Sequence, residues 1–190
     1  MVIHLGPLLR KLTDEDFERF CSQNPDFRIE MTSEGKMIVM LPVTPEGSNR
    51  NFKLTGRFAS WVETDGTGVG FESSAGFTLP NGAKRSPDVS WMRKERWEGL
   101  SPQQRNEFTQ ICPDFVVELR SKTDRLRPLQ KKMEEYIANG AQLGWLIDPI
   151  QQKVHVYRPD SAIEIMSKPA AIFGEPLLPG FALKLDGIID

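Results

Sequence analysis

The sequence predicts an α/β fold: a mixed β-sheet flanked by helices, with an N-terminal helix and a β-hairpin before it. The first observation lies at residues 115–147, where two apolar, strand-like runs enclose a segment with apolar residues at helical spacing. A strand–helix–strand unit of this length is typical of a parallel crossover. The second observation is that strand-like runs separated by turn residues occur on both sides of this unit, which indicates further strands.

The N-terminal half is expected to supply two helices and several strands. Thr13 and the three acidic residues after it have the pattern of a helix cap. The turn residues at 32–35 lie between two strand-like runs, which is typical of a hairpin. The expected elements, in chain order, are a capped helix after Thr13, an antiparallel hairpin over 27–41, a loop at 45–49, a helix ending near 65 with Phe52, Phe58, Ala59 and Val62 on one face, and strands over 69–79 and 89–92.

The central unit begins with residues 115–119, an apolar, β-branched run of the kind found in buried strands. Residues 121–124 are of the capping type, and Asn139-Gly140 is a helix stop signal. The apolar positions of the helix between them are Leu126, Leu129, Met133, Tyr136 and Ile137. Two more strands are expected at 143–147 and 154–157.

Composition indicates a globular chain. Hydrophobic residues make up 39% and charged residues 26% of the 190 residues, which suits one domain spanning 1–190. The net charge of -2 gives no overall attraction to nucleic acid or to anionic membranes. Basic residues nevertheless outnumber acidic ones at 84–96 and at 116–132. A solvated face and a binding surface both explain these two segments.

Cysteine and histidine usage excludes several kinds of site. Cys21 and Cys112 are too few for a disulfide framework and lack metal-binding spacing. His4 and His155 lie far apart, which excludes a histidine-rich zinc site, and His155 is expected to be an ordinary sheet residue. No apolar run approaches the roughly 20 residues of a membrane span, and the N-terminus lacks a signal-peptide pattern. We therefore expect a cytoplasmic protein with no membrane partner.

Two carboxylates stand out. Glu118 interrupts the apolar run at 115–119, and a charge in a buried strand is costly unless something compensates it. Asp88 stands at the start of another expected strand, and carboxylates on neighbouring strands could hold Mg²⁺, which prefers oxygen ligands. Basic residues after Glu118 could then bind a phosphate. The alternative is structural, with Asp88 in a turn and Glu118 in a buried ion pair with Arg120 or Arg125.

Several sequence blocks resemble a known family. The blocks are Ser86–Val89 (SPDV), Pro113–Ser121 (PDFVVELRS), a helix ending in Tyr136 and Gly140, Trp145–Pro149 (WLIDP) and Leu178–Phe181 (LPGF). Over nearly the whole chain they resemble the Uma-two family of restriction endonucleases, within the PD-(D/E)XK nuclease superfamily. The resemblance implies a restriction-endonuclease-like core, often in a homodimer. It also implies an endonuclease that hydrolyses DNA phosphodiester bonds through a metal-activated water, with Mg²⁺ as cofactor and Mn²⁺ as substitute.

The resemblance also implies roles for individual residues. Asp88 and Glu118 match the metal-binding acids of the superfamily, and the carbonyl of Leu119 would be a third ligand. The lysine expected two residues after the glutamate is Arg120 here, and arginine can bind phosphate but cannot deprotonate water. Members of the family often have a lysine in the following helix instead, which matches Lys132.

Helical geometry separates Lys132 from its neighbour Lys131. At roughly 100° per residue, Lys131 lies about 165° from the apolar side of the helix and should point to solvent. Lys132 lies about 95° away, so it can lean over the sheet towards Glu118. Partial burial is expected to lower the pKa of Lys132, which suits water activation. Strand alternation puts Arg120 on the same face as Glu118, within reach of a phosphate near the metal.

Other acidic and polar residues receive smaller roles. Asp148 is expected to end a strand in a turn, and Asp114 to shape the start of the central strand. The accessory candidates for the site are Glu46, Glu72 and Ser121. For Ser121 a helix-cap or turn role is the main expectation, and a phosphate contact is the alternative. The alternative function is a catalytically weak or inactive module of the same fold that binds nucleic acid or a protein partner, and Arg120 favours it.

Overall fold

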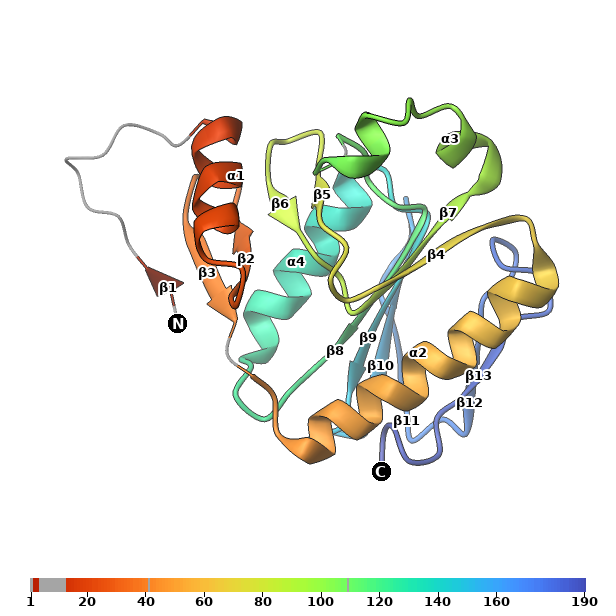
Figure 1. The fold of residues 1–190 in the computed structure, drawn as a ribbon. Coiled ribbons are helices and arrows are strands. Elements are labelled where there is room, and N and C mark those ends of the chain that lie inside the picture. Colours follow the sequence, from red (N-terminus) through yellow and green to blue (C-terminus); the bar gives the residue numbers. More distant parts are fainter. Residues whose placement is uncertain (1, 4–12, 41, 109) are drawn as a thin grey trace.

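The fold is organised around a six-stranded mixed β-sheet with helices on both faces (Figure 1). The computed structural model describes residues 2–3, 13–40, 42–108 and 110–190; His4 and Leu41, which the expectations above include, lie outside these ranges. The strands of the central sheet, in spatial order, are β11 (Glu164–Ser167), β10 (Lys153–Tyr157), β9 (Leu143–Asp148), β8 (Phe115–Leu119), β7 (Val89–Arg93) and β4 (Gly68–Glu72).

The predicted crossover is confirmed. The helix α4 (Leu126–Ala138) connects β8 to β9, and these two strands pair in parallel from Phe115 opposite Leu143 to Leu119 opposite Ile147. The other strand pairs of the central sheet are antiparallel. The expected cap at 121–124 is wrong, because the N-cap residue of α4 is Arg125, which makes no side-chain capping bond.

The two faces of the central sheet bury different clusters. Successive residues of a strand face opposite sides, so Phe115 and Val117 of β8 pack on the face covered by α2 (Pro45–Asp65). The two-stranded sheet of β12 (Ala171–Phe173) and β13 (Ala182–Lys184) covers the same face. Val116 packs against α4 on the other face, and Glu118 must lie on that side too.

A second, five-stranded sheet lies beside α4 (Figure 1). Its strands, in spatial order, are β1 (Val2–Ile3), β3 (Met37–Met40), β2 (Arg28–Met31), β6 (Lys84–Arg85) and β5 (Phe77–Thr78). The predicted hairpin is confirmed, since β2 and β3 pair antiparallel. Ile29 and Met31 pack with Phe17 of the capped helix α1 (Asp14–Gln23), so the alternate residues Arg28 and Glu30 face the other way.

The prediction of the second helix needs correction at its start. Residues 45–49 are not a loop, because α2 begins at Pro45 and Thr44 caps it by accepting a hydrogen bond from the Gly47 amide. Proline suits the first turn of a helix, where its missing N–H costs nothing. The apolar face is also different from the expected one, since Phe52 is 79% exposed while Leu54 and Phe58 are buried.

Further differences from the expected elements are local. Residues 69–79 contain two strands in different sheets, β4 and β5, separated by a turn. The short helix α3 (Lys94–Glu98) was not predicted, and neither was β11. The 3-10 helix η1 (Gln104–Asn106) lies just after Leu100-Ser101-Pro102, where the sequence predicts the start of a short irregular or helical segment. Among the described residues, no helix is both long enough and apolar enough to cross a membrane.

Two glycines offer a test of the packing. A Cβ atom on Gly68 would overlap the buried indole of Trp91, whereas one on Gly56, inside α2, would meet nothing within 4 Å. We expect Gly68→Ala to lower the free energy of unfolding by about 1–3 kcal/mol through overpacking. Gly56→Ala should raise it by about 0.5–1 kcal/mol, because glycine inside a helix is destabilising. Urea denaturation measures both, and changes of the same sign would contradict this account.

Candidate active site

Asp88 and Glu118 are neighbours across a strand pair. β7 and β8 pair antiparallel with Val89 opposite Val117, and the same register places Asp88 opposite Glu118. The Asp88 amide donates to the Val117 carbonyl at 3.0 Å, and its carboxylate Oδ2 accepts from the Leu119 amide at 2.8 Å. The sheet therefore fixes both carboxylates at one place, on the face covered by α4.

Glu118 is buried against two side chains of α4. Its Oε1 lies 2.7 Å from Nζ of Lys132 and accepts a hydrogen bond from the Tyr136 hydroxyl at 3.1 Å. The two partners are one helical turn apart, so they meet the same strand residue. The buried ion pair considered as an alternative thus exists, but its cation is Lys132 and neither Arg120 nor Arg125.

Lys132 lies where the helical geometry predicted, and Lys131 is exposed to solvent. Nζ of Lys132 also lies 2.8 Å from Oε1 of Glu30, so the ammonium is held between two carboxylates. The expected lowering of its pKa is wrong. Burial does oppose the charge, but Glu118 and Glu30 outweigh burial and raise the pKa of Lys132 above its ordinary value.

Glu30 on β2 is a site residue that the sequence reasoning missed. Its Oε1 accepts from the Ser86 amide at 2.9 Å, and its Oε2 lies 3.2 Å from Nη1 of Arg85. Burial would raise the pKa of Glu30, but Lys132 and Arg85 together lower it. One signal was present: Glu30 lies between Ile29 and Met31 in an apolar strand, much as Glu118 interrupts its own strand.

Arg28, two residues earlier on β2, is the second residue that the sequence reasoning missed. Its Nη1 lies 3.6 Å from Oδ1 of Asp88, and its Nη2 donates to the Ser86 carbonyl. The hairpin therefore brings an arginine to one candidate metal ligand and a glutamate to the lysine beside the other. No motif spacing links residues 28–30 to 88 or 118, because their proximity arises only in the folded chain.

The pKa values of both Asp88 and Glu118 are raised. Burial raises the pKa of Asp88, although Arg28 and the Leu119 amide oppose the shift. Burial also raises the pKa of Glu118, Lys132 opposes it, Asp88 and Glu30 add to it, and the result is about 7. A group with this pKa is partly protonated near neutral pH, so binding of a divalent cation would release protons.

Arg120 does not contact the two carboxylates as expected. Its Nη1 lies 2.8 Å from Oδ2 of the buried Asp148, and its Nε donates to the Asp124 carbonyl at 3.2 Å. Strand alternation gave the correct face of the sheet, but Asp148 on the neighbouring strand β9 holds the guanidinium. Asp148 also ends its strand in a turn, as expected, because its Oδ1 accepts from the amides of Ile150 and Gln151.

Among the described residues, the contacts of the three accessory candidates are with residues other than Asp88 and Glu118. Glu46 is exposed and pairs with Arg50 of its own helix at 2.9 Å. Glu72 lies opposite Val89, on the face covered by α2, and is therefore on the wrong side of the sheet for Asp88. Ser121 forms a turn, because its amide and hydroxyl both donate to the Asp124 carboxylate.

Asp114 has the structural role expected of it at the start of β8. Its Oδ2 accepts from the Arg93 amide at 2.9 Å, and its Oδ1 lies 2.7 Å from Nη1 of Arg96. These contacts join the segment before β8 to the end of β7 and to α3. Asp114 thus belongs to the support of the sheet and not to the carboxylate pair.

The donor atoms at the site fit a hard divalent cation. Within the described ranges, no three histidine, cysteine, aspartate or glutamate side chains lie together in a way that could hold a metal ion. Asp88 and Glu118 offer two carboxylates, to which the main-chain carbonyl of Leu119 could add a third oxygen. Mg²⁺ accepts such a partial set, because it keeps several water ligands, whereas structural zinc needs four protein ligands.

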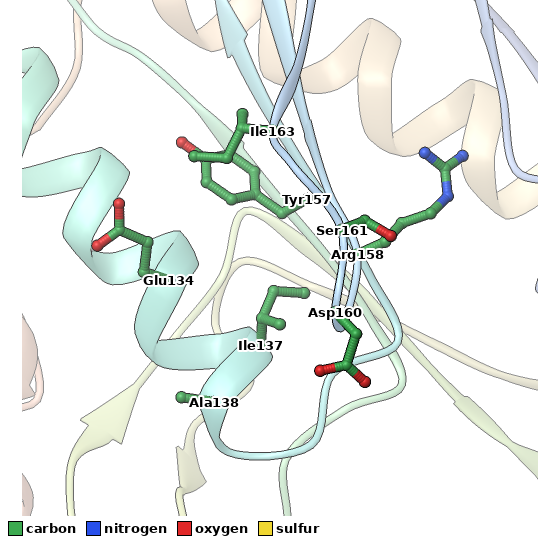
Figure 2. A pocket seen from close by; sticks show the side chains of 8 residues that line it. All are labelled: Glu134, Ile137, Ala138, Tyr157, Arg158, Asp160, Ser161 and Ile163. Carbon is green, nitrogen blue, oxygen red and sulfur yellow. The ribbon is translucent and has the colours of Figure 1, made fainter.

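A shallow hollow elsewhere on the molecule does not belong to this site. Its volume is about 400 Å³, and it lies between α4 and the chain that follows β10 (Figure 2). The lining residues are Glu134, Ile137, Ala138, Tyr157, Arg158, Asp160, Ser161 and Ile163. Neither candidate metal ligand lines it, and neither does Lys132.

The parallel crossover, the mixed sheet and the acidic pair at neighbouring strands define a restriction-endonuclease-like fold. A similar crystal structure is described as that of "a putative nuclease belonging to DUF820 from Anabaena variabilis ATCC 29413". The two chains are 24% identical, the match covers 94% of this chain and 97% of the other, and the TM-score is 0.76. At this identity the likeness shows the fold alone.

The family follows from the sequence match. The model of the Uma2 family, described as "Putative restriction endonuclease", matches residues 14–186. The chain therefore belongs to the Uma2 family, as the motif blocks predicted, and family and fold together support a nuclease. No curated protein matches the chain.

The raised pKa of Glu118 predicts how stability depends on pH. A glutamate titrates near 4.5 when unperturbed and Glu118 near 7, so the folded protein binds more protons than the unfolded chain between these values. Stability therefore falls as pH rises through this window. The glutamine of the variant Glu118→Gln has no proton to gain or lose in this range. The difference between the free energies of unfolding, wild type minus variant, should therefore fall from pH 4.5 to pH 7.

Urea denaturation in EDTA at several pH values measures this difference. Glu72→Gln, at an exposed glutamate of the same sheet, is the control for the same chemical change made away from the site. A Glu118→Gln difference that stays constant or rises across the window would show that Glu118 is not shifted in this direction.

Proposed function

We propose that this protein is a Mg²⁺-dependent endonuclease that hydrolyses DNA phosphodiester bonds. The observation that carries the proposal is the pair Asp88 and Glu118, opposite each other on β7 and β8, with Nζ of Lys132 2.7 Å from Glu118. Membership of the Uma2 family supports a nuclease. The oxygen donors support a hard cation as cofactor, for which Mn²⁺ is a suitable substitute.

Each residue has a role that follows from its position. Asp88, Glu118 and the Leu119 carbonyl would hold the ion, which would supply Lewis-acid stabilisation and a more acidic water. Lys132 would act as a protonated cation, because its raised pKa does not suit a general base. A fixed cation beside a phosphate stabilises the negative charge of the transition state.

A second candidate function is a module of the same fold that binds nucleic acid or a protein partner without catalysis. The observation that favours it is Arg120, which replaces the motif lysine and is held by Asp148. Lys132 weakens this alternative, because it brings a lysine to Glu118 although the motif position holds Arg120. The expected homodimer and the cytoplasmic location stay predictions.

The metal site is tested by Asp88→Asn and Glu118→Gln. Each removes one charged ligand, and we expect Mn²⁺ affinity and the nicking rate of plasmid DNA to fall by more than about 100-fold, since even outer-shell changes cost 10–100-fold. Calorimetry measures Mn²⁺ binding, and gel electrophoresis measures nicking. Glu72→Gln, on the opposite face, should change neither. Nicking by wild type at full rate in excess EDTA would refute the metal dependence.

The role of Lys132 is tested by Lys132→Met, with Lys131→Met as the control. Loss of the cation should slow nicking by about 10²–10³-fold at saturating Mg²⁺, with Mn²⁺ binding retained. It should also lower the free energy of unfolding by about 3–5 kcal/mol, because Glu118 loses its cation and Glu30 keeps only Arg85. Lys132→Arg restores the charge if the methionine variant does not fold. Full nicking by folded Lys132→Met would contradict the assignment.

A further inference from the structure

The cations near the carboxylate pair differ in how firmly they are engaged. Lys132 lies within 2.8 Å of two carboxylates, and Arg85 lies 2.6 Å from Glu135 and 3.2 Å from Glu30. Arg120 lies 2.8 Å from Asp148. Arg28, by contrast, lies further from its carboxylate partner: its Nη1 is 3.6 Å from Oδ1 of Asp88, which is beyond hydrogen-bond distance.

The guanidinium of Arg28 is anchored but not saturated. Its Nη2 donates to the Ser86 carbonyl, which holds the group beside Asp88. Its Nε is buried and has no hydrogen-bond partner among the described residues. Nη1 faces Asp88 without reaching it, and 31% of the side chain is exposed. A guanidinium has five donors in a fixed fork; because Nε is buried, the donors that Arg28 retains for a ligand arriving from solvent belong to its terminal nitrogens.

The chemistry of such a group fits one class of ligand. Arginine forms paired, charge-assisted hydrogen bonds with the oxygens of a phosphate, and it stays charged at every physiological pH. A phosphate bound at the pair Asp88 and Glu118 would lie near Arg28, since Nη1 lies 3.6 Å from Oδ1 of Asp88. The hairpin strand β2 holds the arginine there, together with Glu30.

We propose that Arg28 binds the backbone phosphate of the nucleic acid at the carboxylate pair, the role that the sequence pattern suggested for Arg120. This inference rests on the proposed nuclease function and deepens it by assigning the phosphate contact to the β2–β3 hairpin. Arg28 would be a catalytic residue in the strict sense, because its guanidinium would touch the phosphodiester that is cleaved. Arg120 would be a structural residue that ties β8 to β9 through Asp148.

Salt dependence of DNA binding tests the assignment. Each phosphate contact made by a protein cation contributes about 0.9 to the slope of log binding constant against log salt concentration. Binding to a short DNA duplex is measured by fluorescence anisotropy in Ca²⁺, a hard cation that takes oxygen ligands, and the duplex is checked for integrity afterwards. The control is Arg57→Gln, because Arg57 has a similar side-chain exposure of 30% and also donates to main-chain carbonyls, but belongs to α2.

Arg28→Gln is expected to reduce the slope by about 0.9 and to weaken binding by about ten- to hundredfold. Arg28→Lys keeps the charge but loses the fork, so it should keep the slope and bind more weakly than wild type. Arg57→Gln should match wild type in both. A purely structural role for Arg28 could lower the amount of folded protein but would leave the slope of the folded fraction unchanged.

Each outcome decides the matter. An unchanged slope in folded Arg28→Gln overturns the proposal, and so does a slope that Arg57→Gln reduces equally. If Arg28→Gln does not fold, Arg28→Lys decides, and an affinity equal to wild type overturns the proposal. If wild type binds and nicks DNA while Arg28→Gln keeps the slope, only the Arg28 assignment falls. If wild type neither binds nor nicks DNA, the proposed function falls with it.

Discussion

The ammonium of Lys132, held between the buried carboxylates of Glu30 and Glu118, is the interaction on which the rest of the site depends. Two carboxylates at this depth would repel each other and lose hydration, and the ammonium of Lys132 pairs with both, while Arg85 adds a second cation to Glu30. The three residues come from β2, α4 and β8, so one ion triad joins the hairpin, the crossover helix and the central sheet. Its geometry fixes where Glu118 can point.

The two faces of β8 divide apolar packing from charge. Phe115 and Val117 enter the large apolar cluster under α2, while Glu118 faces α4 with Val116. The apolar face supplies the packing that holds the strand in place. The opposite face can then carry the buried carboxyl group of Glu118, whose pKa is raised to about 7. Shifted pKa values of this kind are typical of functional sites.

Periodic patterns allowed much of the fold to be predicted. The crossover β8–α4–β9 and the hairpin followed from local apolar spacing, and the wheel of α4 placed Lys132 correctly. Glu30 could not be predicted in the same way, because it lies 102 residues from Lys132 in the sequence and meets it only after folding. Arg120 failed for a related reason: alternation gives the face of a side chain but not its competing partner, Asp148. The predicted lowering of the pKa of Lys132 was wrong because the second carboxylate beside it, Glu30, was not foreseen.

The hairpin is attached to the rest of the molecule mainly through charge. β2 and β6 share a single residue pair, Met31 opposite Lys84, whereas Glu30 reaches Lys132, Arg85 and the Ser86 amide. The N-terminal unit of α1 and the hairpin is therefore no detachable appendage, even though it has its own apolar cluster. A relative that had lost this unit would keep both apolar faces of the central sheet, but Lys132 would then pair with Glu118 alone and Arg85 with Glu135 alone. Loss of the unit in evolution would therefore change the charge balance around Glu118 without any substitution at that residue.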